Sequence, residues 1–399
     1  MKKCMAVACA ASFAALLLVL MAAAGMEYRK IQTEETGSEL VTEIVSERTA
    51  VEETGRQPET EEETSGAPEN RDVSETPPAA VLELDGGTEL LLAGDICIQD
   101  YIAGYYEEAG IGGIVSMELR AKMLTADIMM ANQEFVFSER GEPMEDKQFT
   151  FRAAPRYVSM LTDMGIDIVS LANNHAMDYG REALADCFPA LDNAGIRYVG
   201  AGENYERAKR LEIIESGGKK VGILAASRVI PLADWNAGAE RSGMFTAYDP
   251  AALLQEIREG KEKCDVLVVY VHWGEERAEF PEEYQVTMAH QYIDAGADAV
   301  IGAHPHVMQG IEYYKDRVIA YSLGNYIFSP RTGDTALFSL KLKEDGTQEA
   351  RLIPVDASSF PVDVMPYRRQ EEFFRYIESI SFGISIDEAG RICYTQDSE

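Results

Sequence analysis

The sequence predicts one α/β domain in which parallel strand–helix units come first and antiparallel strands come last. From Thr88 onward, short apolar runs alternate with amphipathic segments of helical length, as in parallel strand–helix units. After Gly310, apolar and polar residues alternate one by one, which is typical of antiparallel strands. A chain of 399 residues is long enough for one large α/β domain or two small ones.

The first part of this domain alternates between the two kinds of element. Strands are predicted at the apolar runs, at 89–93, 127–131, 167–171, 220–226, 266–271 and 299–302. Helices are predicted between them, at 116–124, 156–164, 181–193, 250–259 and 282–295. Gly165, Gly195 and Gly296 end three of these helices, and Pro250 suits the first turn of another.

The second part predicts a smaller antiparallel region. Strands are expected at 310–314, 317–323, 336–342 and 350–355, followed by a helix at 368–379. Lys315-Asp316 is a plausible hairpin turn between the first two. We therefore assign 86–358 to the folded domain and 359–399 to a C-terminal extension.

Residues 1–25 have the pattern of an export signal. Met1-Lys2-Lys3 is basic, and residues 4–24 are apolar except for Ser12. The apolar run has the length of about 20 residues that a membrane span needs, which favours an anchor. Ala22-Ala23-Ala24, in contrast, offers a cleavage site. We favour an uncleaved signal anchor over a cleaved signal peptide. The protein is then expected at the cell membrane on its extracytoplasmic face, or secreted if the signal is cleaved.

Residues 26–85 are predicted to be an acidic, disordered linker. Residues 26–80 contain fourteen Glu and one Asp against five Lys or Arg, with few apolar residues. Such a segment cannot bury enough apolar surface to fold, and its like charges extend it. We favour a stalk that holds the domain off the membrane; the alternative is recognition of a cationic partner.

Charge and cysteine content exclude some classes of function. The net charge of −32, with 68 acidic and 36 basic residues, argues against nucleic acid as a partner. Four cysteines lie outside the export signal, at 97, 187, 264 and 393, without paired spacing. Export permits disulfides, but this spacing predicts none, and buried free thiols are the simpler interpretation.

Polar residues end five of the predicted strands. They are Asp95, Glu134, Asn173-Asn174-His175, His272 and His304-Pro305-His306, and they include four of the five histidines. Because strand ends share the carboxyl edge of a parallel sheet, we expect these side chains to converge. Carboxylate, amide and imidazole groups suit Mn²⁺, Zn²⁺ or Fe, and the set is large enough for one or two ions. Any one of these residues alone has an ordinary structural explanation.

The two histidines of His304-Pro305-His306 need a turn to share one ion. Alternate residues of an extended segment point to opposite sides. Pro305 favours a turn between them, so that both rings can face the same side. The alternative is that both rings cap the strand by bonding to nearby carbonyl groups.

Together these segments resemble the CapA family of capsule and poly-γ-glutamate synthesis proteins. The resemblance covers about 88–355 and rests on these stretches: Leu92-Ala93-Gly94-Asp95-Ile96, Asn132-Gln133-Glu134, Phe149-Thr150-Phe151-Arg152-Ala153, Ser170 to Gly180, Val271-His272-Trp273-Gly274, Gly302 to Gly310, and Tyr321 to Tyr326. It implies a metallophosphatase-like four-layer α/β/β/α sandwich with mixed sheets. It also implies a membrane-attached role in making, exporting or processing poly-γ-glutamate or a related anionic polymer.

The resemblance also implies roles for individual residues. Asp95 is similar to the first metal carboxylate of such sites, and Glu134 to the bridging carboxylate. Asn174, His272, His304 and His306 resemble the other metal ligands. His175 resembles the neighbouring histidine that serves the leaving group.

One position departs from the resemblance. Cys97 stands where such proteins usually have a metal-binding histidine two residues after the first Asp. A thiolate binds Zn²⁺, but a small buried Cys is the simpler interpretation. Without that ligand, one of two ions would be held weakly.

Two further residues are candidates for catalysis. Asp178 either orients His175 or caps the helix that follows. Arg152 either clamps an anionic substrate or forms a surface salt bridge.

Two functional hypotheses follow. The first is an extracytoplasmic metal-dependent hydrolase or transferase that acts on an amide or phosphoester bond, with poly-γ-glutamate or a related polymer as partner. The second is a non-catalytic, metal-binding component of a membrane-embedded polymer synthesis and export complex.

Overall fold

The structure is a computed structural model that describes residues 87–329 and 332–395. The predicted export signal and linker, 1–25 and 26–85, lie outside these residues. The chain from Leu82 to Glu399 forms one compact unit. Within the described ranges, no helix combines the length and the apolar character needed to cross a membrane.

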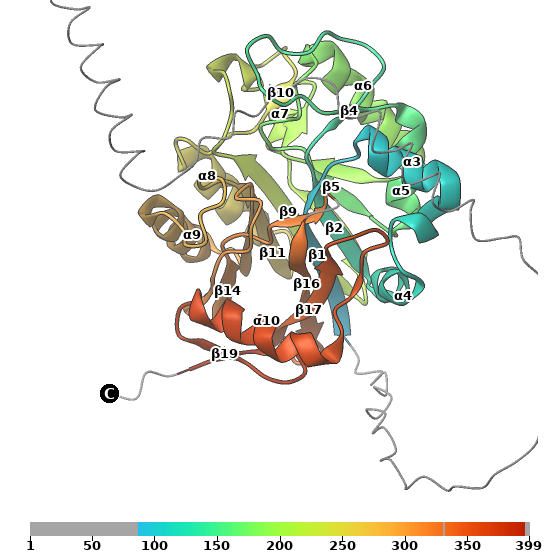
Figure 1. Ribbon diagram of the computed structural model, residues 1–399. Helices are drawn as coiled ribbons and strands as arrows, with labels where there is room; N and C mark the ends of the chain where they lie inside the picture. Colours follow the sequence, from blue (N-terminus) through green and yellow to red (C-terminus); the bar gives the residue numbers. More distant parts are fainter. Residues whose placement is uncertain (1–86, 330–331, 396–399) are drawn as a thin grey trace, which may run out of the picture. The chain divides into compact units, whose positions relative to one another are not determined.

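A sheet of eight strands forms one half of the domain (Figure 1). Its strand order is β18 (Asp363–Val364), β17 (Gln348–Ala357), β16 (Gly333–Lys343), β1 (Gly87–Ile96), β2 (Ile128–Gln133), β5 (Ile168–Ser170) and β6 (Arg197–Val199), and β15 (Asn325–Ile327) also pairs with β1. The pairs from β1 to β6 are parallel, whereas β16, β17 and β18 are joined by antiparallel pairing.

A second, six-stranded sheet forms the other half. Its order is β13 (Ile311–Tyr314), β14 (Arg317–Ala320), β12 (Ala299–Ala303), β11 (Val266–His272), β9 (Lys219–Ser227) and β8 (Glu212–Ser216). The four central strands are parallel, and β13 and β8 are antiparallel edges. Three further pairs of short strands lie outside both sheets: β3 (Val136–Phe137) with β4 (Arg152–Ala153), β7 (Ala201–Gly202) with β10 (Gly243–Met244), and β19 (Ile384–Ile386) with β20 (Ile392–Tyr394).

Helices connect the strands. They are α3 (Asp100–Ala109), α4 (Met117–Thr125), α5 (Val158–Asp163), α6 (Gly180–Ala194), α7 (Tyr205–Ala208), α8 (Ala251–Lys261), α9 (Glu283–Ala295) and α10 (Tyr367–Ser379), with short 3-10 helices at Gly110–Gly113, Pro155–Tyr157 and Ala233–Trp235. Local sequence explains several ends: Ser116 caps α4, Glu282 and Gln285 form a capping box at α9, and Gly195 ends α6 with φ of 74°.

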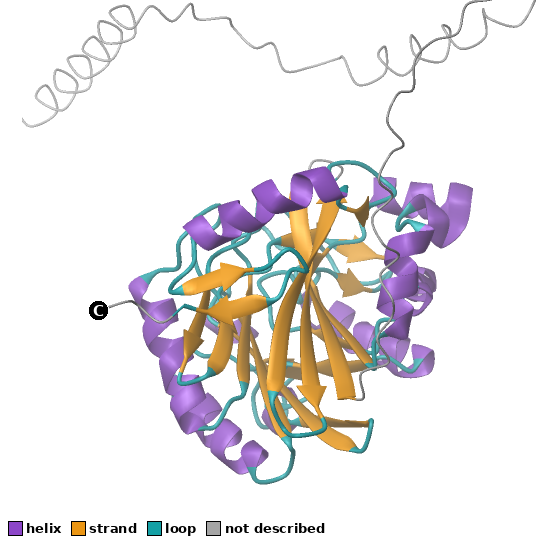
Figure 2. Cartoon of the chain, turned by 90° about the horizontal axis from the view of Figure 1, so that it is seen from below, coloured by secondary structure: helices purple, strands orange, loops and turns teal. Residues whose placement is uncertain are grey.

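Three apolar clusters show that the domain has four layers (Figure 2). The first cluster joins the first sheet to α3, α4, α5 and α6. The second fills the space between the sheets, with Leu92 and Met130 from one and Ile223 and Ile301 from the other. The third joins the second sheet to α8 and α9. The α/β/β/α sandwich with mixed sheets is thus confirmed.

Residues 359–395 pack onto this sandwich. β18 continues the first sheet beside β17, and Phe373, Phe374 and Ile377 of α10 belong to the cluster between the sheets. Segment 359–395 therefore contributes to the core of the described domain.

One topological expectation was right in part, and another was wrong. Segment 317–323 was predicted to be an antiparallel strand, and β14 does pair antiparallel with β13, but it also pairs in parallel with β12. The polar strand ends were expected at one sheet edge, but they come from both sheets. Asp95, Glu134 and Asn174 follow the first sheet, and His272 and His304 follow the second.

Residues 321–325, here called the crossing segment, join the two sheets near these strand ends. Leu323 N donates to Gly302 O at 3.0 Å in the second sheet, and Asp95 N donates to Gly324 O at 2.9 Å in the first. The approach is so close that a Cβ on Gly302 would lie 1.9 Å from Tyr321 O, and one on Gly94 1.9 Å from Gly324 O. Glycine is therefore required on both sides of the crossing segment.

Candidate metal centre

Asp95 anchors the first-sheet side of the site. It is fully buried near the end of β1. Asn132 Nδ2 donates to its Oδ1 at 2.8 Å, and the backbone N–H of His304 donates to Oδ2 at 3.3 Å. Asp95 therefore connects the end of the first sheet directly to the histidine turn of the second.

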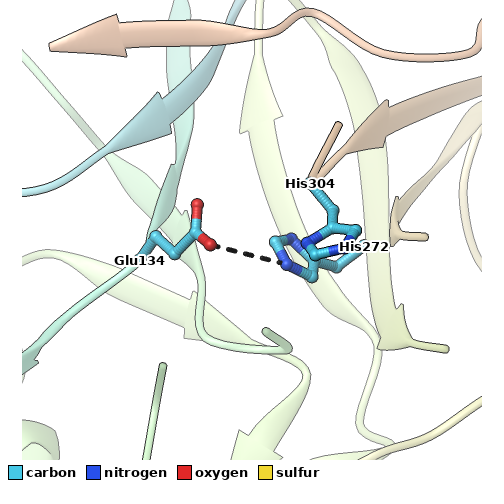
Figure 3. A group of neighbouring side chains, drawn as sticks. All are labelled: Glu134, His272 and His304. Atoms are coloured by element: carbon cyan, nitrogen blue, oxygen red, sulfur yellow. Dashed lines mark ion pairs between the residues drawn. The ribbon is translucent and has the colours of Figure 1, made fainter. Parts of the chain in front are cut away.

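Glu134 lies at the centre of the predicted residues. It is fully buried, and neither carboxylate oxygen has a hydrogen-bond partner. The Nε2 atoms of His272, His175 and His306 lie 3.7, 3.8 and 3.9 Å from its Oε1. Figure 3 shows this carboxylate facing the rings of His272 and His304. Since buried polar groups normally have partners, the unpaired carboxylate indicates a site for a cation.

His272 and Asn174 lie at the inner end of the site. His272 ends β11 and is buried, with Nε2 2.8 Å from Asn174 Oδ1. Asn173, the residue before, holds this loop in place by donating from Nδ2 to Gln133 O at 2.8 Å. The ring nitrogen and the amide oxygen are thus held side by side, as two ligands of one ion would be.

The backbone turns between the two following histidines, as predicted. His304 and His306 both have positive φ, 100° and 59°, which is uncommon for residues other than glycine. Their rings lie 5.9 Å apart between centroids. His306 Nδ1 lies 2.8 Å from Asn325 Oδ1 and 3.4 Å from Asp95 Oδ2, whereas His304 Nδ1 is buried without a partner. Backbone strain of this kind is typical of functional sites.

Burial and neighbouring charge set the protonation of the cluster. Burial raises the pKa of Glu134, and the adjacent Asp95 raises it further. Burial, followed by neighbouring histidines, lowers the pKa of His272, and it lowers that of His304 to about 4. Burial alone would lower the pKa of His306, but Glu134 and Asp95 raise it to about 10. The negative charge of this cluster thus favours the protonated form of His306, as it would favour a bound cation.

His175 is oriented by a buried ion pair. Its Nδ1 lies 2.6 Å from Asp178 Oδ2, and Lys147 Nζ contacts Asp178 Oδ1, the carbonyl oxygen of Asn174 and His175 Nδ1. Phe151 N donates to Asp178 Oδ2 at 2.7 Å. Burial lowers the pKa of His175, and Asp178 opposes that effect. The bonds to Nδ1 direct Nε2 toward Glu134.

Two of the residues considered from the sequence, Arg152 and Cys97, contribute no donor atom to the cluster. Arg152 NH1 donates to the carbonyl oxygens of Arg140 and Gly141 at 3.0 and 3.1 Å, and its guanidinium stacks on Tyr179. These bonds are neither a clamp on the site nor a salt bridge. Cys97 is fully buried, and burial, followed by Glu134, raises its pKa well above the usual thiol value.

The ligand atoms form overlapping groups that fit a metal ion. Glu134, His272 and His304 form one, Asp95, Glu134 and His306 a second, and Glu276, His304 and His306 a third, with the ligand atoms of each group within 4.8 Å of one another. Five of the six predicted metal residues belong to these groups, and Asn174 contacts one of them. Carboxylate and imidazole donors suit divalent transition metals.

Sequence reasoning missed three residues of the site. Asn132 bridges Asp95 and Asn173, Lys147 binds Asp178, and Glu276 faces the two histidines of the turn. Asn132 has a recognisable signal, because it ends a strand just before Glu134. Lys147 lies in a long loop and Glu276 in an acidic one, so nothing in the sequence distinguishes either from an ordinary surface charge.

The fold and the site define a class of α/β/β/α proteins in which two mixed sheets carry carboxylates and imidazoles at their strand ends. More narrowly, the chain belongs to the family described as bacterial capsule synthesis protein PGA_cap, whose model matches residues 89–330.

Named relatives agree with this assignment. The chain is 35% identical to the capsule biosynthesis protein CapA of Bacillus anthracis over 218 residues, 53% of each chain. It is 32% identical to the PGA biosynthesis protein CapA of Bacillus subtilis strain 168 over 268 residues, 66% of this chain and 70% of that one. The matched region thus spans about half the length of the first relative.

Solved structures with a similar arrangement are distant in sequence. The sulfate thiohydrolase SoxB of Thermus thermophilus matches with a TM-score of 0.40 and 12% identity, over 76% of this chain and 61% of that one. The protein TT1561, also of Thermus thermophilus, matches with a TM-score of 0.38 and 11% identity, over 66% of this chain and 98% of that one.

Proposed function

We propose that this protein is a divalent-metal-dependent hydrolase or transferase that makes or processes poly-γ-glutamate or a related anionic capsule polymer. The family and the named relatives support the role in capsule polymer synthesis. The single observation that supports metal dependence is the Glu134 carboxylate, which is buried without a hydrogen-bond partner among three imidazoles.

Six residues would hold one or two ions of Mn²⁺, Zn²⁺ or Fe. They are Asp95, Glu134, Asn174, His272, His304 and His306. Such an ion would polarise a carbonyl or phosphoryl oxygen and make a bound water more acidic. The donors fit because two of them, Glu134 and His304, have buried atoms for which the described part of the chain offers no hydrogen-bond partner.

His175 supplies proton transfer in this proposal. Its Nδ1 is held by Asp178, which fixes the ring so that Nε2 points to the side of Glu134. With Nδ1–H donated to Asp178, Nε2 of the neutral ring can take a proton from the attacking water and pass it to a leaving amine or alkoxide. Asp178 and Lys147 act as positioning residues, since they touch His175 and not the reacting atoms.

The proposal places the domain outside the cytoplasm at the cell membrane. The basic and apolar pattern of residues 1–25 supports membrane attachment, with secretion as the outcome if the signal is cleaved. The acidic segment 26–85 would then act as the stalk, and a membrane-embedded synthesis complex would be the partner.

A second candidate function is a non-catalytic metal-binding component of that complex. Cys97 favours it, because this buried, neutral thiol replaces a metal-binding histidine that the resemblance implies. With one ligand fewer, ions would be retained for structure or for binding carboxylates.

Metal analysis and activity measured on one sample distinguish the two functions. The full-length chain, purified in mild detergent, is analysed for bound metals and then assayed on poly-γ-glutamate and on a generic phosphodiester. The enzyme proposal expects a bound transition metal and turnover that His306→Ala abolishes. Bound metal without turnover would favour the binding component, and no bound metal after loading with Mn²⁺ or Zn²⁺ would overturn both.

A further inference from the structure

The loop that follows β11 carries a carboxylate that the predicted metal residues do not include. A Glu276 oxygen and one nitrogen each from His304 and His306 lie within 4.8 Å of one another. The main chain sets this approach, because Arg277 N donates to Pro305 O at 2.7 Å. Glu276 is the residue before Arg277, and His304 and His306 are the residues on either side of Pro305.

A second observation points to a ligand at His304, one of these three residues. His304 is 5% exposed, and its Nδ1 has no hydrogen-bond partner. A buried ring nitrogen is normally bonded, and its unpaired state is costly. Both histidines also have a strained backbone, with positive φ. Such strain is typical of functional sites.

We propose that Glu276, His304 and His306 form an outer cation position, distinct from an inner one at Glu134 and His272. This inference depends on the proposed function, since it concerns the same metal centre. One carboxylate and two imidazoles form a donor set for Zn²⁺, Mn²⁺ or Fe. Three protein donors also leave a coordination position open, as in catalytic sites.

The outer position resolves a competition among the donors. His304 also belongs to a group with Glu134 and His272, and His306 to a group with Asp95 and Glu134, so the groups share their histidines. When Glu276 holds these two rings, Glu134 and His272 remain for the inner ion, with Asp95 and Asn174 beside them. Each ion then has its own donors.

Glu276 thereby replaces the donor that Cys97 does not provide. The Cys97 thiol is fully buried and belongs to none of the donor groups found in the described chain. Glu276 approaches from a loop of the other sheet and is exposed. An ion there adds positive charge at the solvent side of a chain of net charge −32, which favours the approach of an anionic substrate.

The test counts ions and measures their affinity. The full-length chain is stripped with a chelator, dialysed against Mn²⁺ or Zn²⁺, and analysed by elemental mass spectrometry and titration calorimetry. The variants are Glu276→Gln, Glu276→Asp and, as the matched control, Glu275→Gln, which removes the same charge from the neighbouring exposed residue. Circular dichroism checks that each variant is folded.

The proposal expects two ions per chain in the wild type and in Glu275→Gln. Glu276→Gln should weaken the lower-affinity ion at least about tenfold, a loss typical of damaged metal sites, and Glu276→Asp should weaken it less. Two ions bound to Glu276→Gln with wild-type affinity, or one ion in the wild type that Glu276→Gln leaves unchanged, would overturn the outer position and leave the proposed function standing. A wild type that binds no ion would overturn both.

Discussion

The Asp178 carboxylate lies 2.6 Å from His175 Nδ1 and has no exposed surface. His175 and Asp178 are three positions apart in the sequence. Lys147, from a loop distant in the sequence, forms an ion pair with the Asp178 carboxylate. The choice between orienting His175 and capping the next helix is thus decided in favour of orientation, since α6 has no side-chain cap bond.

Asp178→Asn should lower kcat by roughly 10²-fold or more, because an amide cannot stabilise the same tautomer of His175. KM and the metal content should change little, because Asp178 touches no predicted metal ligand side chain. Steady-state kinetics and metal analysis of the same preparation measure both. A fall in metal content equal to the fall in kcat would instead assign Asp178 a structural role.

Glu134→Gln should abolish the stabilisation that a metal gives to the folded chain. A ligand at a hundred times its Kd stabilises the native state by about 2.7 kcal/mol, and this gain requires the carboxylate. The measurement is the change in Tm on adding Mn²⁺, with Glu118→Gln, an exposed helix residue, as control. An equal metal-dependent rise in Tm for both variants would exclude Glu134 as a ligand.

Metal binding near pH 8 should release about one proton or more, because ligands must be deprotonated before they bind. Glu134 and Asp95 raise the pKa of His306 to about 10, so the free protein holds this proton at pH 8. His304, whose pKa is lowered to about 4, is already neutral and releases none. The release should decline as the pH approaches 10.

Calorimetry in buffers of different ionisation enthalpy measures this release. His306→Ala should remove it, whereas His290→Ala, a histidine paired with Glu312 away from the site, should not. A binding enthalpy that is independent of the buffer at pH 8 would contradict a charged His306.

Gly302→Ala should destabilise the fold by about 1–3 kcal/mol, the usual cost of overpacking. Its Cβ would lie 1.9 Å from Tyr321 O, a backbone atom that cannot move without shifting the crossing segment. Gly104→Ala in α3 is the control, because no atom lies within 4 Å of its new Cβ. There a gain of roughly 0.5–1 kcal/mol is expected. Urea unfolding of both variants gives the comparison.

Most helices and strands could be predicted from the sequence, because the periodicity of apolar residues is a local property. It missed α3, which contains Gly104 and three tyrosines and is stabilised by burying Ile102 and Ala103. It also placed β14 in an antiparallel region, since the partner of a strand is decided by tertiary packing and not by its own alternation.

The candidate metal centre was also predicted from a local feature of the sequence, the polar residues at the ends of strands. Residues at strand ends carry a positional signal, and the structure brings Asp95, Glu134 and four of the histidines together. Arg152 was a candidate because of its charge alone, but its guanidinium bonds backbone carbonyls. Lys147 and Glu276 reach the site from loops, whose paths no periodicity specifies.

The crossing segment limits which residues around the candidate metal centre can change in evolution. Its main chain is bonded to Gly302 on one side and to Asp95 on the other, and the spacing is set by carbonyl groups in contact with glycines. A metal-binding side chain can therefore be exchanged without altering the distance between the two sheets at the metal centre. Selection can change the metal or the chemistry one side chain at a time, while the glycines, which bind nothing, are the positions least free to vary.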